Sequence, residues 1–106
     1  MANYCMYRLN YKIMTNKHLR IFFSGIGGSG VSAIAAFMAD KGHIVSGSDR
    51  AFELQPYHPA CRTLKNKGIT IVPQDGSGIT ATLDLAVFST AVEPDRPEYV
   101  RPTRSR

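Results

Sequence analysis

The sequence predicts an α/β fold with a mostly parallel sheet of four to five strands, and three observations lead to this prediction. Short apolar runs with β propensity alternate with helix-like runs through the middle of the chain. The strand-like runs are apolar on both sides of the pleat, which is typical of parallel strands covered on both faces. A glycine-rich loop joins the first strand-like run to the first helix-like run. Together these features favour a Rossmann-like three-layer domain.

The first half of the domain begins with a strand expected over residues 20–24, because residues 19–24 read LRIFFS. A helix is expected over residues 29–41, since apolar side chains return there at helical spacing. These side chains are Val31, Ile34, Ala35 and Met38. Gly42 suits the C-terminal cap of this helix. A second strand over residues 43–47 then leads to Ser48 and Asp49.

The second half is expected to begin with a loop over residues 50–58 and a helix over 58–67. A third strand over 69–72, a turn over 75–78 and a fourth strand over 85–89 follow. Pro59 suits the first turn of the helix, and Gly68 lies where a C-terminal cap belongs. The turn has the sequence Asp75-Gly76-Ser77-Gly78, which is a typical turn signal. No internal repeat is evident in the chain.

The length of 106 residues allows one domain with a small core. We expect residues 19–100 to form this domain, which would bind a nucleotide or nucleotide-sugar if the glycine-rich loop is a phosphate-binding loop. Residues 1–18 lack a clean period and are expected to be an N-terminal extension open to disorder. Residues 101–106 are expected to be an irregular basic tail, because they combine Pro102 with three arginines.

The net charge of +5 is confined to the two ends of the chain. Residues 21–95 contain five basic and seven acidic side chains, so the body of the domain carries no basic stripe of the kind that binds nucleic acid. No apolar run is long enough for a signal peptide or a membrane span, so no membrane partner is expected. Cys5 and Cys61 do not make a disulfide framework. A reduced, cytoplasmic setting is therefore the expectation.

The glycine-rich loop is the strongest candidate site. Gly25, Gly27 and Gly30 have the G-x-G-x-x-G spacing of a nucleotide-phosphate loop, with Gly28 and Ser29 between them. In such a loop Gly25 permits a tight turn, Gly27 lets a diphosphate approach the backbone, and Gly30 lets the helix pack closely on the strand. The N-terminus of the following helix would then face the anion. The alternative is a glycine-rich turn with a structural role only.

Two further groups follow the carboxyl ends of expected strands. Asp49 comes nineteen residues after Gly30, where an acid can bind ribose hydroxyls in a dinucleotide site. The structural alternative is an aspartate that holds its own backbone turn. Ser89, Thr90 and Ala91 follow the fourth strand, where hydroxyls can donate to phosphate or sugar oxygens, or simply mark the end of the strand. Because ligands of parallel sheets bind at this edge, these groups are expected to converge there.

No catalytic or metal site is expected in this chain. The three histidines are scattered over different elements, and no Cys/His/Asp cluster has the spacing of metal ligands. No nucleophile lies next to a candidate base. A G-x-x-x-x-G-K-[ST] loop is also lacking, so the sequence offers no site for an ATP γ-phosphate.

The run from Phe23 to Arg50, FSGIGGSGVSAIAAFMADKGHIVSGSDR, resembles the N-terminal domain of the Mur ligases, in particular the members that act on UDP-N-acetylmuramate. Those proteins carry a G-I-G-G-[ST]-G loop, then a helix, then a strand that ends in S-G-S-D. Residues 85–92, LAVFSTAV, look like the apolar strand of the family that ends in S-[ST]-A-[IV]. Asp95, Pro97 and Glu98 resemble the D-x-P-E that comes after it, so the resemblance covers about residues 19–99.

The resemblance implies a domain that binds the UDP part of UDP-N-acetylmuramate in peptidoglycan biosynthesis or recycling. It also implies that residues 27–30 meet the diphosphate, and that Asp49 and residues 89–91 help to hold the nucleotide and sugar. Full-length members use ATP and Mg²⁺ to make an acyl phosphate, which an amine attacks to give an amide. Those members continue into a central domain with an ATP loop and a C-terminal domain, and this sequence ends at Arg106. We therefore expect a truncated domain with no cofactor of its own and no ligase activity alone, whose exposed strand edges are compatible with self-association.

Two other functions are kept beside the Mur ligase interpretation. An NAD(P)-binding domain of an oxidoreductase would share the glycine-rich loop and Asp49. A nucleotide-sensing regulatory module would use the same site without catalysis. The S-T-A-V sequence and the Asp95, Pro97 and Glu98 pattern favour the ligase family over the oxidoreductase. The regulatory module would instead show self-association that depends on the ligand.

Overall fold

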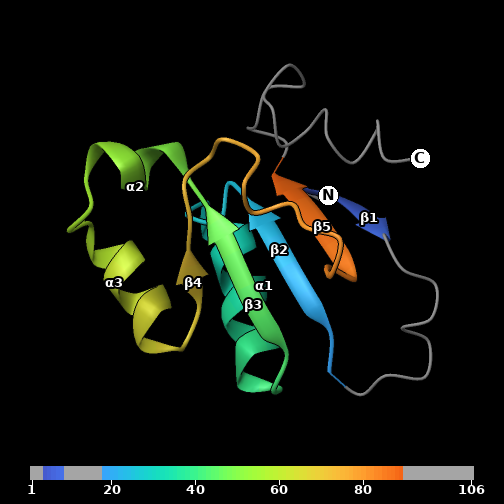
Figure 1. The fold of residues 1–106 in the computed structure, drawn as a ribbon. Helices are drawn as coiled ribbons and strands as arrows, with labels where there is room; N and C mark the ends of the chain where they lie inside the picture. The colour runs from blue at the N-terminus through green and yellow to red at the C-terminus, as the bar shows by residue number, and fades with distance from the viewer. Residues whose placement is uncertain (1–3, 9–17, 90–106) are drawn as a thin grey trace.

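The fold is an α/β arrangement, seen in a computed structural model that describes residues 4–8 and 18–89 (Figure 1). The described residues form five strands and three helices, in the order β1 (Tyr4–Arg8), β2 (Arg20–Ser24), α1 (Ser29–Asp40), β3 (Ile44–Ser48), α2 (Arg50–Leu54), α3 (Pro59–Asn66), β4 (Thr70–Ile71) and β5 (Leu85–Ser89). The expected strands and helices of the domain body are all present, with small changes at their ends.

The strands form one mixed sheet in the order β1-β5-β2-β3-β4. Strands β2, β3, β4 and β5 are parallel, and β1 pairs with β5 in the antiparallel direction. This confirms the predicted mostly parallel sheet. Strand β2 is central: Ser24 pairs in register with Ser48 on one side and with Phe88 on the other.

Strand β1 lies within residues 1–18, which were expected to be an N-terminal extension without a clean period. Residues 4–8 pair along the whole of β5, from Tyr4 opposite Ser89 to Arg8 opposite Leu85. The physical reason is the edge of β5, because an unpaired strand presents a row of backbone N–H and C=O groups that a β-prone run can satisfy. Residues 1–3 and 9–17 of the extension and the tail at 101–106 lie outside the described residues.

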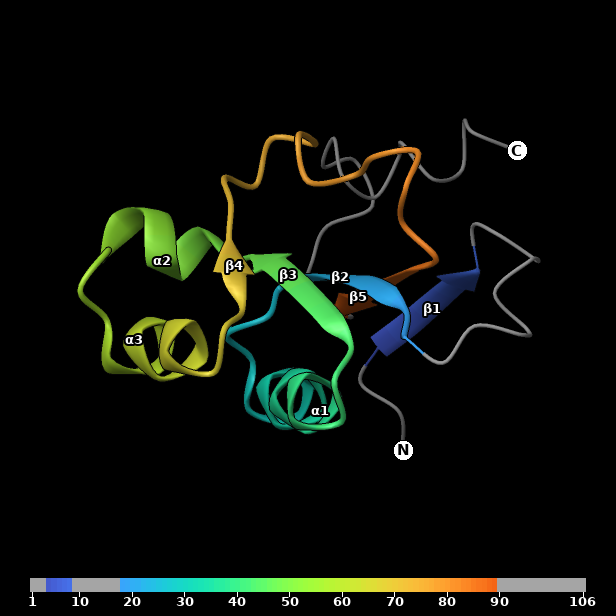
Figure 2. The same ribbon diagram turned by 60° about the horizontal axis from the view of Figure 1, so that its bottom comes forward.

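The sheet is the middle of three layers (Figure 2). Helices α1 and α3 cover one face, and the connection from β4 to β5 covers the other. On the helix side the buried core consists of Ile21, Phe23, Ile26, Val31, Ala35, Val45, Phe52, Cys61, Leu64, Ile69 and Val87. On the other side it consists of Phe22, Ile79, Leu83, Ala86 and Phe88. Alternate residues of β2 and β5 thus enter the two cores, as expected for strands that are apolar on both sides.

The second face is closed by a loop that packs through a glycine. A Cβ on Gly78 would lie 2.3 Å from Cε1 of Phe22, so the absence of a side chain lets the loop lie flat on the ring. The predicted turn is confirmed here: the Ser77 N–H donates to Oδ1 of Asp75 at 2.9 Å, and Gly76 has a φ of +92°. Hydrogen bonds from Ser77 lower the pKa of Asp75 below its ordinary value, and the Ser77 hydroxyl contributes more than the Ser77 N–H.

Helix α2 lies within residues 50–58, where a loop was expected. The Asp49 side chain accepts the N–H of Ala51 and so caps the helix at its start. The side chain of Phe52 is buried, and Glu53 accepts the N–H of Gln74 at 3.0 Å, which ties α2 to the loop after β4. A helix of five residues is too short to show an apolar period, so sequence pattern could not reveal it.

The other helix boundaries agree with the sequence signals. Gly42 and Gly68 follow α1 and α3 with φ values of +94° and +83°, the left-handed conformation that a helix C-terminus favours. Pro59 opens α3, and His58 caps it. Within residues 4–8 and 18–89, no helix has both the length and the apolar character needed to cross a membrane.

Candidate functional site

The glycine-rich loop lies at the point where the direction of strand addition reverses. After β2 the chain builds β3 and β4 on one side, and it then returns to add β5 on the other side of β2. The loop, residues 25–30, leaves the carboxyl end of β2 at this switch point. In open α/β sheets ligands bind in the crevice outside such a point. The structure therefore places the loop where a ligand site is expected.

The loop is a tight turn that is tied to the end of β3. Gly25 has a φ of +80°, which only glycine adopts without cost, and the Gly28 N–H donates to its carbonyl oxygen at 3.2 Å. The N–H groups of Gly25 and Ile26 donate to the carbonyl oxygen of Ser48 at 2.8 and 3.0 Å. The role predicted for Gly25 is confirmed by this geometry.

The Asp49 carboxylate links the loop to α2. Its Oδ2 accepts the N–H of Gly27 at 2.8 Å, and its Oδ1 accepts the N–H of Ala51 at 2.9 Å. The structural interpretation of Asp49 as a turn-forming residue is thus supported, and the contact with Gly27 adds a second function to it. Each carboxylate oxygen can accept a further hydrogen bond, so the predicted contact with a ribose stays a prediction.

The space beside Gly27 is filled by protein. A Cβ on Gly27 would lie 2.8 Å from Oδ2 of Asp49 and 3.0 Å from Cζ of Phe52. We expected this missing side chain to make room for a diphosphate. In the structure it makes room for a carboxylate and an aromatic ring, which hold the backbone of the loop from that side.

The closest approach between the loop and the sheet is at Gly47. A Cβ there would lie 2.5 Å from Cδ1 of Ile26 and 2.8 Å from the carbonyl oxygen of Phe23. The sequence pattern predicted this packing role for Gly30, which instead lies exposed in the first turn of α1. The reason is that Ile26 turns inward and occupies the gap between the loop and β3, where it is fully buried.

The start of α1 has the features that favour an anion at a helix N-terminus. Gly28 caps the helix with a φ of −63° and a ψ of 145° and supplies no side-chain cap, and the described first turn contains no acidic residue. The first hydrogen bond inside the helix runs from the Ser32 N–H to the Gly28 carbonyl oxygen at 2.7 Å. The preceding N–H groups, those of Ser29 to Val31, are the ones that an α-helix leaves unpaired at its start. Together with the positive end of the helix dipole they favour a bound anion.

The third predicted group is described only in part. Ser89 ends β5 and is buried, whereas Thr90 and Ala91 lie outside the described residues. Two serines that were not singled out as candidates lie at the corresponding ends of the neighbouring strands, Ser24 on β2 and Ser48 on β3, and both are buried. A serine at the last residue of β2, β3 and β5 is a repeated position that could have revealed them.

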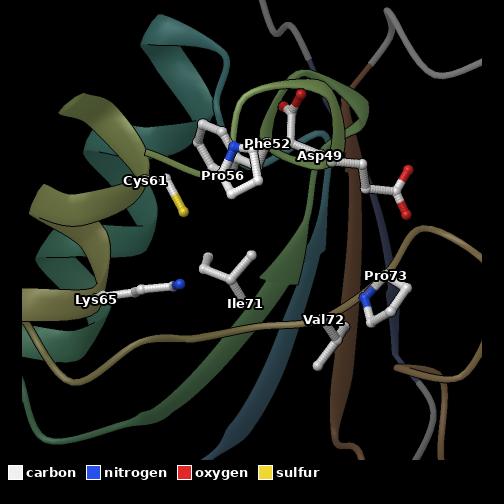
Figure 3. Close-up of a pocket in the computed structure, with 9 residues that line it drawn as sticks. Asp49, Phe52, Pro56, Cys61, Lys65, Ile71, Val72 and Pro73 are labelled. Atoms are coloured by element: carbon white, nitrogen blue, oxygen red, sulfur yellow. The ribbon is translucent and has the colours of Figure 1, made fainter. Parts of the chain in front are cut away.

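A pocket beside Asp49 is a further feature that the sequence did not reveal (Figure 3). Its volume is about 200 Å³, and it lies between α2, α3 and the β4 strand. Its lining consists of Asp49, Phe52, Glu53, Pro56, Cys61, Lys65, Ile71, Val72 and Pro73. Because α2 was expected to be a loop, the wall formed by Phe52 could not be foreseen. Arg50, at the start of the same helix, is exposed.

The described histidines all contact backbone groups. His18 bonds through Nδ1 to the Gly42 carbonyl oxygen at 3.0 Å, and His43 accepts the Leu19 N–H at 3.0 Å. His58 accepts the Ala60 N–H at 3.1 Å. Among residues 4–8 and 18–89, no three His, Cys, Asp or Glu side chains come together as a metal site would require. The same residues do not contain the G-x-x-x-x-G-K-[ST] sequence of an ATP phosphate loop.

Comparison with known families shows which protein family has these loop and strand motifs. Residues 20–106 match the sequence profile of the Mur ligase family, catalytic domain. The chain belongs to the Mur ligase family. The resemblance seen in the sequence is therefore confirmed.

Curated relatives from several bacteria carry the name UDP-N-acetylmuramate–L-alanine ligase. The protein of Lachnospira eligens is 38% identical over 92 residues, which cover 84% of this chain and 18% of the relative. That of Aromatoleum aromaticum is 41% identical over 93 residues, covering 88% and 18%. That of Dictyoglomus turgidum is 41% identical over 81 residues, covering 76% and 16%. The chain thus spans less than a fifth of the length of these relatives.

Proposed function

We propose that this chain binds the UDP part of UDP-N-acetylmuramate for an ATP-dependent Mur ligase of peptidoglycan biosynthesis. The observation that carries the proposal is the N-terminus of α1, which opens at the switch point of the sheet without a side-chain cap and without an acid in its first turn. This is the position and the chemistry of a diphosphate site.

The proposal gives individual residues the following roles. The N–H groups of Ser29 and Gly30 would donate to the diphosphate, because both residues are exposed in the first turn. The remaining lone pairs of Asp49 would accept from a ribose hydroxyl. Ser89, which ends β5 on the other side of the switch point, would contact the sugar. Thr90 and Ala91 stay predicted sugar contacts that lie outside the described residues.

Membership of the Mur ligase family supports this proposal over the two alternatives. The names of the matched relatives include UDP-N-acetylmuramate, a diphosphate-containing ligand of the kind that the proposal requires. An NAD(P) site would use the same loop and the same acid, so ligand binding is the property that separates the two classes.

The proposal is tested by thermal unfolding of the full chain with UDP-N-acetylmuramate, UDP, NAD and NADP at equal concentrations. A ligand that binds only the folded protein raises the unfolding midpoint by mass action. We expect UDP-N-acetylmuramate and UDP to raise it and the two dinucleotides to leave it unchanged. A rise with NAD or NADP alone would reject the proposal in favour of a dehydrogenase-like domain.

A further inference from the structure

We infer that Phe52 is a positioning residue for the diphosphate loop: its ring fixes the backbone of Gly27 and thereby the anion-binding N–H groups next in the chain. The inference rests on the proposed function, because it concerns the same site. Phe52 belongs to neither of the two glycine motifs, and it lies in a segment whose sequence does not predict a helix.

The contact between the ring and the loop is close. Phe52 is 5% exposed, and its Cζ lies 3.0 Å from the position that a Cβ of Gly27 would occupy. Oδ2 of Asp49 lies 2.8 Å from the same position. A ring and a carboxylate therefore share the space beside Gly27. The carboxylate fixes the direction of the Gly27 N–H, and the ring limits how far the backbone can move towards α2.

The Phe52 ring is itself held in place by contacts on the side away from Gly27. The Phe52 N–H donates to the carbonyl oxygen of Asp49 at 3.0 Å, in the helical turn that the Asp49 side chain caps. The centroid of the ring lies 5.7 Å from that of His58, and His58 caps α3. Phe52 is thus a wedge between the loop and the start of α3. Because the ring is fixed by α2 and His58, it restricts the backbone of the loop that it contacts.

The position of Gly27 matters for binding because the next three residues begin helix α1. Gly28 is the cap of α1, and Ser29 and Gly30 carry the exposed N–H groups of the first turn. Donors that are already oriented bind an anion more strongly than donors that must be ordered on binding. Removing the ring would let Gly27 move into the space that the ring leaves. This would lower the affinity for the anion without changing any charge.

A direct role of the ring would give a different result. Phe52 also lines the pocket beside Asp49, where the base of a nucleotide could touch it (Figure 3). Inorganic pyrophosphate has the charge of a diphosphate but no base. If Phe52 acts through the loop, its loss weakens the binding of UDP and of pyrophosphate by the same factor. If it touches the base, only the binding of UDP weakens.

The matched variants are Phe52→Leu and Phe22→Leu in the full chain. Both remove the same atoms from a buried ring, but Phe22 lies on the opposite face of the sheet, against Gly78. Affinities for UDP and pyrophosphate are measured by NMR titration, together with the solvent exchange of the Gly27 amide. We expect Phe52→Leu to weaken both ligands equally, by about tenfold, and to speed the Gly27 exchange. Phe22→Leu should leave the affinities and the Gly27 exchange unchanged while lowering the unfolding midpoint.

Two other outcomes overturn the inference. If only the binding of UDP weakens, Phe52 contacts the base directly. If Phe52→Leu and Phe22→Leu lower the affinities equally, the loss of binding reflects lower stability of the whole fold. If the wild-type chain binds neither ligand, the proposed function fails, and the Gly27 exchange alone then decides whether Phe52 holds the loop. If Phe52→Leu does not fold, Phe52→Met, which keeps the volume but not the rigidity of the ring, replaces it with the same expected direction.

Discussion

Asp49 and Gly27 are joined by a hydrogen bond of 2.8 Å between the carboxylate Oδ2 and the backbone N–H. The two residues belong to different motifs, S-G-S-D at the end of β3 and G-I-G-G-S-G after β2. The same carboxylate accepts the Ala51 N–H at 2.9 Å, so one side chain fixes the loop and starts α2. The loop is therefore held by its neighbouring strand before any ligand arrives.

This relationship predicts the effect of replacing Asp49. Asp49→Ala leaves two backbone N–H groups without their acceptor and should lower the free energy of unfolding by about 2–3 kcal/mol. Asp49→Asn keeps one acceptor oxygen and should cost about half as much. Urea unfolding measures both. Asp40→Ala is the control, because Asp40 forms an exposed ion pair with Lys67 whose loss should cost under about 0.5 kcal/mol. Equal stabilities of the two Asp49 variants and the control would contradict the bridging role.

The approach of Ile26 to Gly47 gives a second prediction. Gly47→Ala places a Cβ 2.8 Å from the backbone oxygen of Phe23, which cannot move without shifting β2. We expect a loss of about 2–4 kcal/mol in the free energy of unfolding. Gly28→Ala is the matched control, since its Cβ would meet nothing closer than 3.5 Å, and it should cost under about 1 kcal/mol. A Gly47→Ala variant as stable as Gly28→Ala would show that the loop does not pack as described.

The cap of α3 gives a third prediction. His58→Ala removes the acceptor of the Ala60 N–H and should cost about 1 kcal/mol, whereas His58→Asn restores an acceptor and should recover most of that loss. Both variants lose the ring contact with Phe52, so the difference between them isolates the cap. The comparison is made by thermal unfolding at neutral pH, where a cap effect predicts a higher midpoint for His58→Asn. Identical midpoints would assign the role of His58 to its ring.

The turn at Asp75 gives a prediction for pH. Hydrogen bonds from the Ser77 hydroxyl and N–H favour the ionised form and lower the pKa of Asp75 below its ordinary value. A carboxyl whose pKa is lower in the folded state stabilises the fold above its unfolded pKa, and this contribution is lost as the pH falls through the folded pKa. NMR titration of the Asp75 carboxyl should show the low pKa, and Ser77→Ala should raise it part of the way by removing the hydroxyl. A pKa that Ser77→Ala leaves in place would contradict this assignment.

The parts of the fold that could be predicted from the sequence are those with local signals. Strands β2 and β5 have the expected bounds, because each is a short apolar run that ends at a polar or glycine-rich segment. Helix α1 was visible through its apolar spacing and Gly42. Strand β1 was missed because its partner β5 lies far along the chain, and nothing within residues 4–8 encodes that pairing.

Like the fold, the candidate site could be predicted from the sequence only in part. Parallel topology alone brings the glycine-rich loop and Asp49 to one edge of the sheet, and the structure confirms that they meet. The sequence could not show that Phe52 fills the space beside Gly27, because this contact depends on α2, whose start is fixed by the Asp49 side chain. The packing role expected of Gly30 belongs to Gly47 in the structure, since the direction of Ile26 is a matter of tertiary packing.

The central claim is that the start of α1 is a diphosphate site for a UDP-sugar, and backbone amide NMR during titration with UDP-N-acetylmuramate tests it most directly. We predict that the largest changes in chemical shift fall on the amides of Ser29, Gly30 and Val31, followed by Gly27 through its bond to Asp49. The amides around Gly78, on the opposite face of the sheet, should stay unchanged. Changes confined to other parts of the chain, or none at saturating ligand, would contradict the claim.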